Sequence, residues 1–93
     1  MSVYPVAIIG AGPAGLAAAI QLQRYGIGAL LLEAEAVGGL LRNANLVENY
    51  PGFPQGIPGM ELARLFAGQL EQQGVTVTYA RVSAVKDEGD AFC

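Results

Sequence analysis

The 93-residue sequence predicts an α/β fold with three parallel strands, and three observations support this prediction. Short apolar runs at 3–9, 29–33 and 75–79 are rich in residues that favour strands. Segments in which apolar residues have helical spacing separate these runs. A glycine-rich turn, GAGPAG, joins the first run to the first helical segment. Strands that alternate with helices are typical of a parallel sheet.

The first strand is expected at 3–9, where the lack of polar alternation favours a strand that is covered on both faces. Pro13 stands where a first helical turn would begin. A helix of small and aliphatic residues is therefore expected over 14–25, ending at Gly26. The second strand follows at 29–33.

The next segment, 34–58, has no helical or strand period and is punctuated by glycine and proline. Loops of this length are usually functional or disordered. Within it, Tyr50 and Phe53 are expected to pack beside the neighbouring prolines rather than stack on a ligand ring. The apolar residues that follow predict the buried stripe of an amphipathic helix that ends before Gly74. These residues are Leu62, Leu65, Phe66 and Leu70.

After the third strand at 75–79, residues 82–86 predict another strand, 87–90 a turn, and 91–93 a returning strand. We therefore expect the start of a β-meander. The order β, α, β, loop, α, β indicates a Rossmann-like mononucleotide-binding half with right-handed crossovers and strand order 3-2-1. Because the sequence stops within the last hairpin, residues 1–93 are expected to be the N-terminal portion of an incomplete domain.

The composition argues against several classes of function. A net charge of −3 without a basic cluster disfavours a nucleic-acid partner. No apolar run approaches the roughly 20 residues that span a membrane, and no secretory signal begins the chain, so we expect a cytoplasmic protein. The chain has no histidine and a single cysteine, Cys93, which excludes an intrachain disulfide, a Ser-His-Asp triad and a His/Cys zinc site. Any redox chemistry would therefore belong to a cofactor.

Gly10, Gly12 and Gly15 fit the pattern G-x-G-x-x-G between a strand and a helix. Gly10 would allow the tight turn, Gly12 would let a pyrophosphate approach the backbone, and Gly15 would let helix and strand pack closely. The helix start, with Pro13 and Ala14, offers free backbone N–H groups and a partial positive charge. The pattern predicts a diphosphate site, and the alternative is a turn that is merely flexible.

Glu33 ends the second strand, where a carboxylate typically accepts hydrogen bonds from an adenosine ribose. The alternative is a solvated charge at a strand end. The next residues include a second carboxylate, Glu35, and no arginine, and such a pair would repel a 2′-phosphate. The site is therefore expected to take NAD or FAD rather than NADP, and the long segment 34–58 favours the larger cofactor, FAD.

The stretches GAGPAG, LLLEAEAVGG and VENYPGFPQGIPG resemble, in order and spacing, the FAD-binding N-terminal part of the thioredoxin reductase-like flavoproteins. This family comprises the class II pyridine nucleotide-disulfide oxidoreductases and related ferredoxin–NADP reductases, and the resemblance covers nearly the whole chain. It implies that Gly38 and Gly39 let the backbone approach the flavin and that Asn49 bonds the ring, unless that amide caps its own turn. Leu40, where many members carry glutamine, and Val82 complete the predicted cofactor contacts.

The resemblance also implies a parent enzyme that is longer than this chain. Family members carry a second domain that binds NADPH and holds a Cys-x-x-Cys pair. We therefore expect FAD bound here, NADPH or NADH bound by a domain or subunit absent from this chain, and a homodimeric parent with a redox acceptor that the sequence does not identify. The isolated chain is expected to be inactive. The alternatives are a non-catalytic nucleotide-binding or assembly module that acts with another subunit, and an NAD-dependent dehydrogenase half-domain.

Overall fold

The computed structural model describes residues 3–93, which form three strands, two α-helices and one short 3-10 helix. In chain order these are β1 (Val6–Ile9), α1 (Pro13–Arg24), β2 (Ala29–Glu33), η1 (Gly39–Asn43), α2 (Gly59–Gln72) and β3 (Val77–Tyr79). The order confirms the predicted succession of strands and helices. The 3-10 helix η1 lies in the segment for which no period was found.

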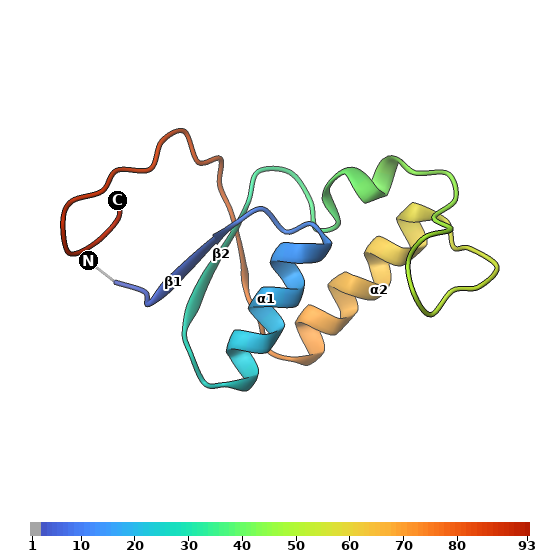
Figure 1. Cartoon of the computed structure of the whole chain (residues 1–93), viewed down its shortest axis with the longest axis horizontal. Coiled ribbons are helices and arrows are strands. Elements are labelled where there is room, and N and C mark those ends of the chain that lie inside the picture. The colour runs from blue at the N-terminus through green and yellow to red at the C-terminus, as the bar shows by residue number, and fades with distance from the viewer. Residues whose placement is uncertain (1–2) are drawn as a thin grey trace.

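The three strands form one parallel sheet with β2 in the centre, as predicted (Figure 1). Val6 pairs with Ala29 at the start of the first ladder, and Leu31 pairs with Val77 at the start of the second. The first strand is shorter than the predicted run 3–9. Pro5, which has no N–H group to give to a ladder, directly precedes the first paired residue.

Helices α1 and α2 lie side by side on one side of the sheet (Figure 1). Leu31 of β2 and Leu62 of α2 are each 1% exposed and lie at the centre of the core. The remaining buried apolar residues come from the turn after β1, both helices and the long loop. They are Ala11, Leu16, Ala19, Val47, Ile57, Ala63, Phe66 and Leu70. No helix within residues 3–93 is long and apolar enough to cross a membrane.

The other face of the sheet is open in the described part of the chain. Side chains of β1 alternate between half-buried and exposed, and Ile9 is 57% exposed. The sequence predicted a first strand covered on both faces. Because α1 and α2 pack on the same side, residues 3–93 cover only one face.

The buried stripe of α2 differs from the prediction at one position. Leu62, Phe66 and Leu70 are buried as expected, but Leu65 is 52% exposed. Ala63 is buried instead, because α2 turns that side toward Gly38 at the start of η1. The prediction for Leu65 is therefore wrong.

The predicted strand at 82–86 does not form, because no other described strand lies beside it to complete a ladder. The hairpin that follows consists of one isolated antiparallel bridge between Asp87 and Phe92. Lys86 and Cys93 exchange two backbone hydrogen bonds of 2.8 and 2.9 Å. Its predicted turn is confirmed, since Asp87 Oδ1 accepts a hydrogen bond from the Gly89 N–H at 2.9 Å. In Figure 1 this segment forms an arm beside the sheet.

The start of α2 packs against the end of η1 through a glycine. The Gly59 N–H donates to the Ala44 carbonyl at 3.0 Å. A Cβ at position 59 would overlap with the carbonyl oxygens of Leu41 and Ala44. Only glycine therefore fits between η1 and α2 without moving backbone.

We predict that Gly59→Ala lowers the free energy of unfolding by roughly 1–3 kcal/mol, because backbone must shift to admit the methyl group. Gly68→Ala is the matched control. Gly68 is exposed within α2, and a Cβ there meets nothing within 4 Å. Removing a flexible glycine from a helix should therefore stabilise the fold by about 0.5–1 kcal/mol. Thermal unfolding followed by circular dichroism measures both, and equal effects at the two positions would contradict the packing argument.

Candidate functional site

The glycine-rich turn leaves β1 at the carboxyl edge of the sheet, beside the end of β2. The Gly10 N–H donates to the Leu32 carbonyl at 2.8 Å, which ties the start of the turn to the neighbouring strand. Gly10 has φ of +101°, a conformation that residues with a side chain rarely adopt. The predicted role of Gly10 in a tight turn is thus supported by its backbone.

Gly15, in the first turn of α1, allows the helix to pack closely on the turn. A Cβ at this position would overlap with the Gly10 carbonyl oxygen and would lie 3.3 Å from Cγ2 of Ile8 in β1. The predicted role of Gly15 in close helix–strand packing follows directly from these contacts.

Gly12 differs from the other two motif glycines because no contact within residues 3–93 requires a glycine there. Its φ of −75° suits any residue, and a Cβ there would meet no atom within 4 Å. It directly precedes α1, whose first turn holds Pro13 and Ala14, no acidic residue and no side-chain cap. The first N–H groups of a helix have no partner within it, so this terminus offers donors and partial positive charge beside an open space.

Ala11, between these glycines, joins three segments of the chain through its backbone. Its N–H donates to Glu33 Oε1 at 2.8 Å, and its carbonyl accepts from the Gly38 N–H at 2.8 Å. The residue is fully buried. The sequence analysis missed Ala11 because it contributes peptide groups and no reactive side chain. Its place between the first two motif glycines was the signal that could have identified it.

Glu33 is 9% exposed, and both oxygens of its carboxylate accept hydrogen bonds. Oε1 accepts a hydrogen bond from the Ala11 N–H and Oε2 accepts one from the Glu35 N–H, each at 2.8 Å. These bonds, the one from Ala11 first, hold the pKa of Glu33 below its ordinary value of 4.5, although burial opposes them. The group is therefore ionised at neutral pH. Each oxygen keeps a second lone pair, so the carboxylate retains capacity to accept hydroxyl groups.

The second glycine pair lies against the first motif. Gly38 and Gly39 have φ of +107° and +57°, and a Cβ on Gly39 would stand 3.5 Å from the Gly12 Cα. With the bond from Gly38 to Ala11, these contacts bring the two predicted glycine segments together. Leu40, next in the chain, is 87% exposed.

Asn49 and Val82 are not drawn into this cluster. Asn49 is exposed on the loop between Val47 and Ile57, which pair as an isolated bridge. Figure 1 places this loop on the far side of η1 from the glycine turn. Val82 is half-buried in the segment that follows β3.

Two aromatic side chains of the long loop, Tyr50 and Phe53, pack within the protein, and the partners that the structure gives them are aromatic rings, whereas the sequence suggested prolines. The ring centroids of Tyr50 and Phe66 lie 5.4 Å apart with an edge-on geometry, and those of Tyr50 and Phe53 lie 6.3 Å apart. Such pairs stabilise the loop against α2. Tyr50 and Phe53 therefore fasten the loop to the helix.

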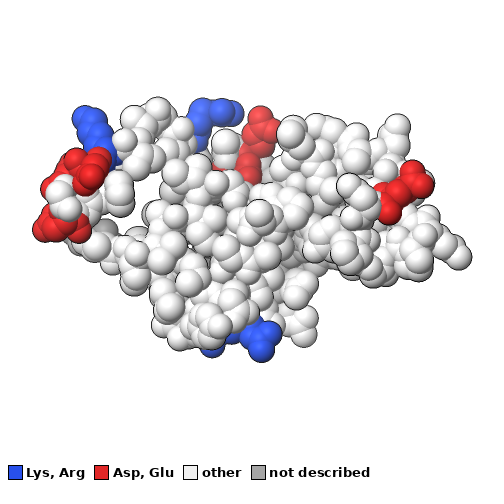
Figure 2. All heavy atoms as spheres, in the orientation of Figure 1, with Lys and Arg blue, Asp and Glu red and all other residues white. Residues whose placement is uncertain are grey.

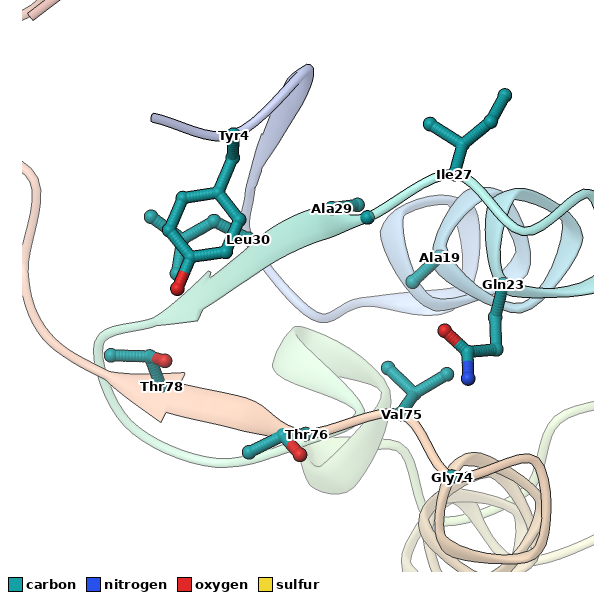
Figure 3. A pocket seen from close by; sticks show the side chains of 11 residues that line it. Tyr4, Ala19, Gln23, Ile27, Ala29, Leu30, Gly74, Val75, Thr76 and Thr78 are labelled. Carbon is teal, nitrogen blue, oxygen red and sulfur yellow. The ribbon is translucent and has the colours of Figure 1, made fainter. Parts of the chain in front are cut away.

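A hollow of about 380 Å³ lies at the other end of the sheet (Figure 3). Its walls include Ala29 at the amino end of β2, Val75 before β3, and Gln23 of α1. Its lining contains no charged residue. Ligands of open parallel sheets bind beyond the carboxyl ends of the strands, so this hollow is not the candidate site.

Charged side chains occur in small separate groups on the face seen in Figure 2. One pair, at the ends of β2 and β3, was missed by the sequence analysis. Arg81 Nη2 lies 3.9 Å from Glu35 Oε1. Parallel pairing of β2 with β3 brings these residues together, because their carboxyl ends reach the same edge.

We predict that Glu33→Gln destabilises the protein at pH 7 by roughly 1.5–3 kcal/mol, because an amide cannot accept both backbone N–H groups with charge assistance. A lowered pKa means that the native state gains stability from the ionised carboxylate above the ordinary pKa of 4.5 and loses it as pH falls further. The difference between the two proteins should therefore shrink on acidification below that value. Urea unfolding at several pH values measures it, with exposed Glu71→Gln on α2 as the control. A constant difference would contradict the assignment.

Comparison with known proteins places the chain in a family. Residues 4–92 match the family described as pyridine nucleotide-disulphide oxidoreductase. The chain is 39% identical to the thioredoxin reductase of Bacillus subtilis over 85 residues, which are 91% of this chain and 27% of that protein. It is 37% identical to the thioredoxin reductase of Mycoplasma pneumoniae over 90 residues, 97% of this chain and 28% of that protein. The chain thus spans less than a third of the length of these relatives.

Solved structures agree in fold. Thioredoxin reductase from Lactococcus lactis superposes with a TM-score of 0.89 at 42% identity, over 97% of this chain and 29% of that one. A ferredoxin-flavin thioredoxin reductase from Clostridium acetobutylicum gives a TM-score of 0.89 at 33% identity, over 99% and 32% respectively. The fold, the glycine turn and the match over nearly every residue lead to one assignment. The chain belongs to the pyridine nucleotide-disulphide oxidoreductase family.

Proposed function

We propose that this chain binds FAD and forms the FAD-binding portion of an NAD(P)H-dependent flavoprotein oxidoreductase. The type is that of its relatives, the thioredoxin and ferredoxin-linked reductases. The observation that carries the proposal is Gly12. Neither its φ nor its neighbours require glycine, yet it stands in an open space beside an uncapped helix terminus. A ligand that must approach the backbone supplies the reason that the fold does not.

The residues present fit the successive parts of such a ligand. Gly12 and the first N–H groups of α1, those of Ala14 and Gly15, would hold the diphosphate. Glu33, ionised and with free lone pairs, would accept the ribose hydroxyl groups. The Gly38–Gly39 backbone would form the wall beside the diphosphate. Leu40, Asn49 and Val82 remain proposed contacts for more distant parts of FAD.

The residue types in this chain indicate which steps the protein and the cofactor would each perform. A bound flavin supplies the redox chemistry of such enzymes. This chain has no histidine, and its one cysteine, Cys93, is exposed at the far hairpin. Its own residues would therefore bind and orient the cofactor and would not take part in the redox chemistry.

FAD is favoured over NAD by the path of the long loop. The chain after β2 returns to the glycine turn, where the Gly38 N–H donates to the Ala11 carbonyl. It then spends residues 44–58 on a loop that packs on α2. A short connection would suffice for an NAD site. We propose that the nicotinamide cofactor, NADPH or NADH, binds to a domain or subunit outside this chain, in a homodimeric cytoplasmic parent.

We predict that Gly12→Val weakens FAD binding by at least a hundredfold, because the branched side chain would occupy the space proposed for the diphosphate. Folding should change by less than about 0.5 kcal/mol, since the position is open and its φ is ordinary. Flavin fluorescence titration and thermal unfolding of the apoprotein measure the two effects separately.

Gly28→Val is the matched control for this variant. Gly28 precedes β2 at the opposite edge of the sheet, and a Cβ there also meets nothing within 4 Å. That variant should bind FAD normally. FAD affinity of Gly12→Val within tenfold of the unsubstituted protein would show that the turn does not hold a diphosphate and would overturn the proposed function.

We also predict that the purified 93-residue chain does not oxidise NADPH faster than free FAD does. It contains one G-x-G-x-x-G turn, which Glu33 and Glu35 assign to a nucleotide without a 2′-phosphate, and it has no dithiol. The assay is steady-state NADPH oxidation with excess FAD and an artificial electron acceptor. Turnover clearly above the free-flavin rate would require a nicotinamide site within this chain and would refute the assignment.

A further inference from the structure

Contacts link the glycine turn, Glu33, Glu35 and Arg81 in that order along the carboxyl edge of the sheet. On one side, Oε1 accepts from Ala11 in the glycine turn. On the other side, Oε2 accepts from Glu35. The Glu35 side chain in turn faces Arg81, with 3.9 Å between Oε1 and Nη2. Glu33 therefore lies between the glycine turn and the Glu35–Arg81 pair.

A backbone hydrogen bond joins the segments that follow β2 and β3. The Ala80 N–H donates to the Glu33 carbonyl at 2.9 Å, and Arg81 is the next residue after this bond. The side chains of Arg81 and Glu35 are 74% and 81% exposed. An ion pair this exposed adds little to stability. Stabilisation of the fold by this ion pair is therefore a weak reason for an arginine at the carboxyl edge of the sheet.

The order of groups in a dinucleotide indicates which group would lie beside Arg81. The adenosine ribose lies between the diphosphate and the base. If the diphosphate lies at Gly12 and the ribose at Glu33, the base extends away from the glycine turn, toward Glu35 and Arg81. A guanidinium is planar and stacks on aromatic faces more readily than an ammonium group.

We propose that Arg81, oriented by Glu35, stacks on the adenine ring of the bound dinucleotide and makes the site selective for flavins that carry an adenosine. This inference rests on the proposed FAD function. Arg81 is the ligand contact, and Glu35 is a positioning residue. The backbone N–H of Glu35 serves Glu33 independently of its side chain, so the two roles separate by mutation.

Binding of three probes to the flavin-free protein tests the assignment. Arg81→Ala should weaken FAD and ADP by about threefold to thirtyfold, the range expected for loss of a cation–π contact, and leave FMN within twofold. Arg81→Lys keeps the charge but loses the planar group, so it should recover only part of the affinity. Arg64→Ala, an exposed arginine on α2, is the matched control and should bind all three probes normally.

The outcomes separate this inference from the function on which it rests. Absence of FAD binding by the unsubstituted protein overturns the proposed function. Normal FAD binding that Arg81→Ala leaves unchanged overturns the stacking role alone. An equal loss for FMN, or full recovery in Arg81→Lys, also overturns it, because the first indicates a structural defect and the second a simple charge effect.

A double variant tests the role of Glu35. Glu35→Gln removes the charge that orients the guanidinium and keeps the backbone bond to Glu33. It should weaken FAD and ADP by less than Arg81→Ala does. The double variant Arg81→Ala with Glu35→Gln should bind no more weakly than Arg81→Ala alone. Additive losses would show that Glu35 acts independently of Arg81.

Discussion

A hydrogen bond from the Ala11 N–H to the Glu33 carboxylate, 2.8 Å long and buried, joins the turn after β1 to the end of β2. Further hydrogen bonds at the carboxyl edge of the sheet extend from this one. The Ala11 carbonyl accepts from the Gly38 N–H, and the second carboxylate oxygen of Glu33 accepts from the Glu35 N–H. Because the Glu33 carboxylate is ionised, the two hydrogen bonds that it accepts, from Ala11 and Glu35, are stronger than bonds between neutral groups. These bonds hold the turn after β1, the end of β2 and the start of the long loop together.

The motif glycines have distinct physical causes that the pattern alone does not separate. Gly10 is required by its backbone conformation, and Gly15 by the carbonyl oxygen that a side chain would strike. Gly12 is required by neither. Two of the three therefore serve the fold, and the third, Gly12, is the one that we propose to serve the bound dinucleotide. If the proposed role is correct, Gly12 is the residue of this turn at which cofactor binding and folding should respond separately to mutation.

The sequence predicted the elements that have a strong periodic signal and failed where tertiary contacts decide. The three parallel strands, the two helices and the strand order followed from pattern and topology. Five-residue η1 is too short to show a period. The strand expected at 82–86 needs a neighbour to pair with, which local propensity does not report. Arg81 lies far from Glu35 in sequence, and only the parallel register of β2 and β3 brings it near.

The Ala11 N–H is bonded to a side chain, whereas the amides within the sheet are bonded to neighbouring strands. Its exchange with solvent deuterium therefore requires release of the Glu33 carboxylate and does not require the ladders to open. Most protected amides in a parallel sheet report on the strands as a group. In this chain the Ala11 amide reports on the turn, and a nuclear magnetic resonance signal from Ala11 would distinguish local opening of the site from unfolding of the sheet.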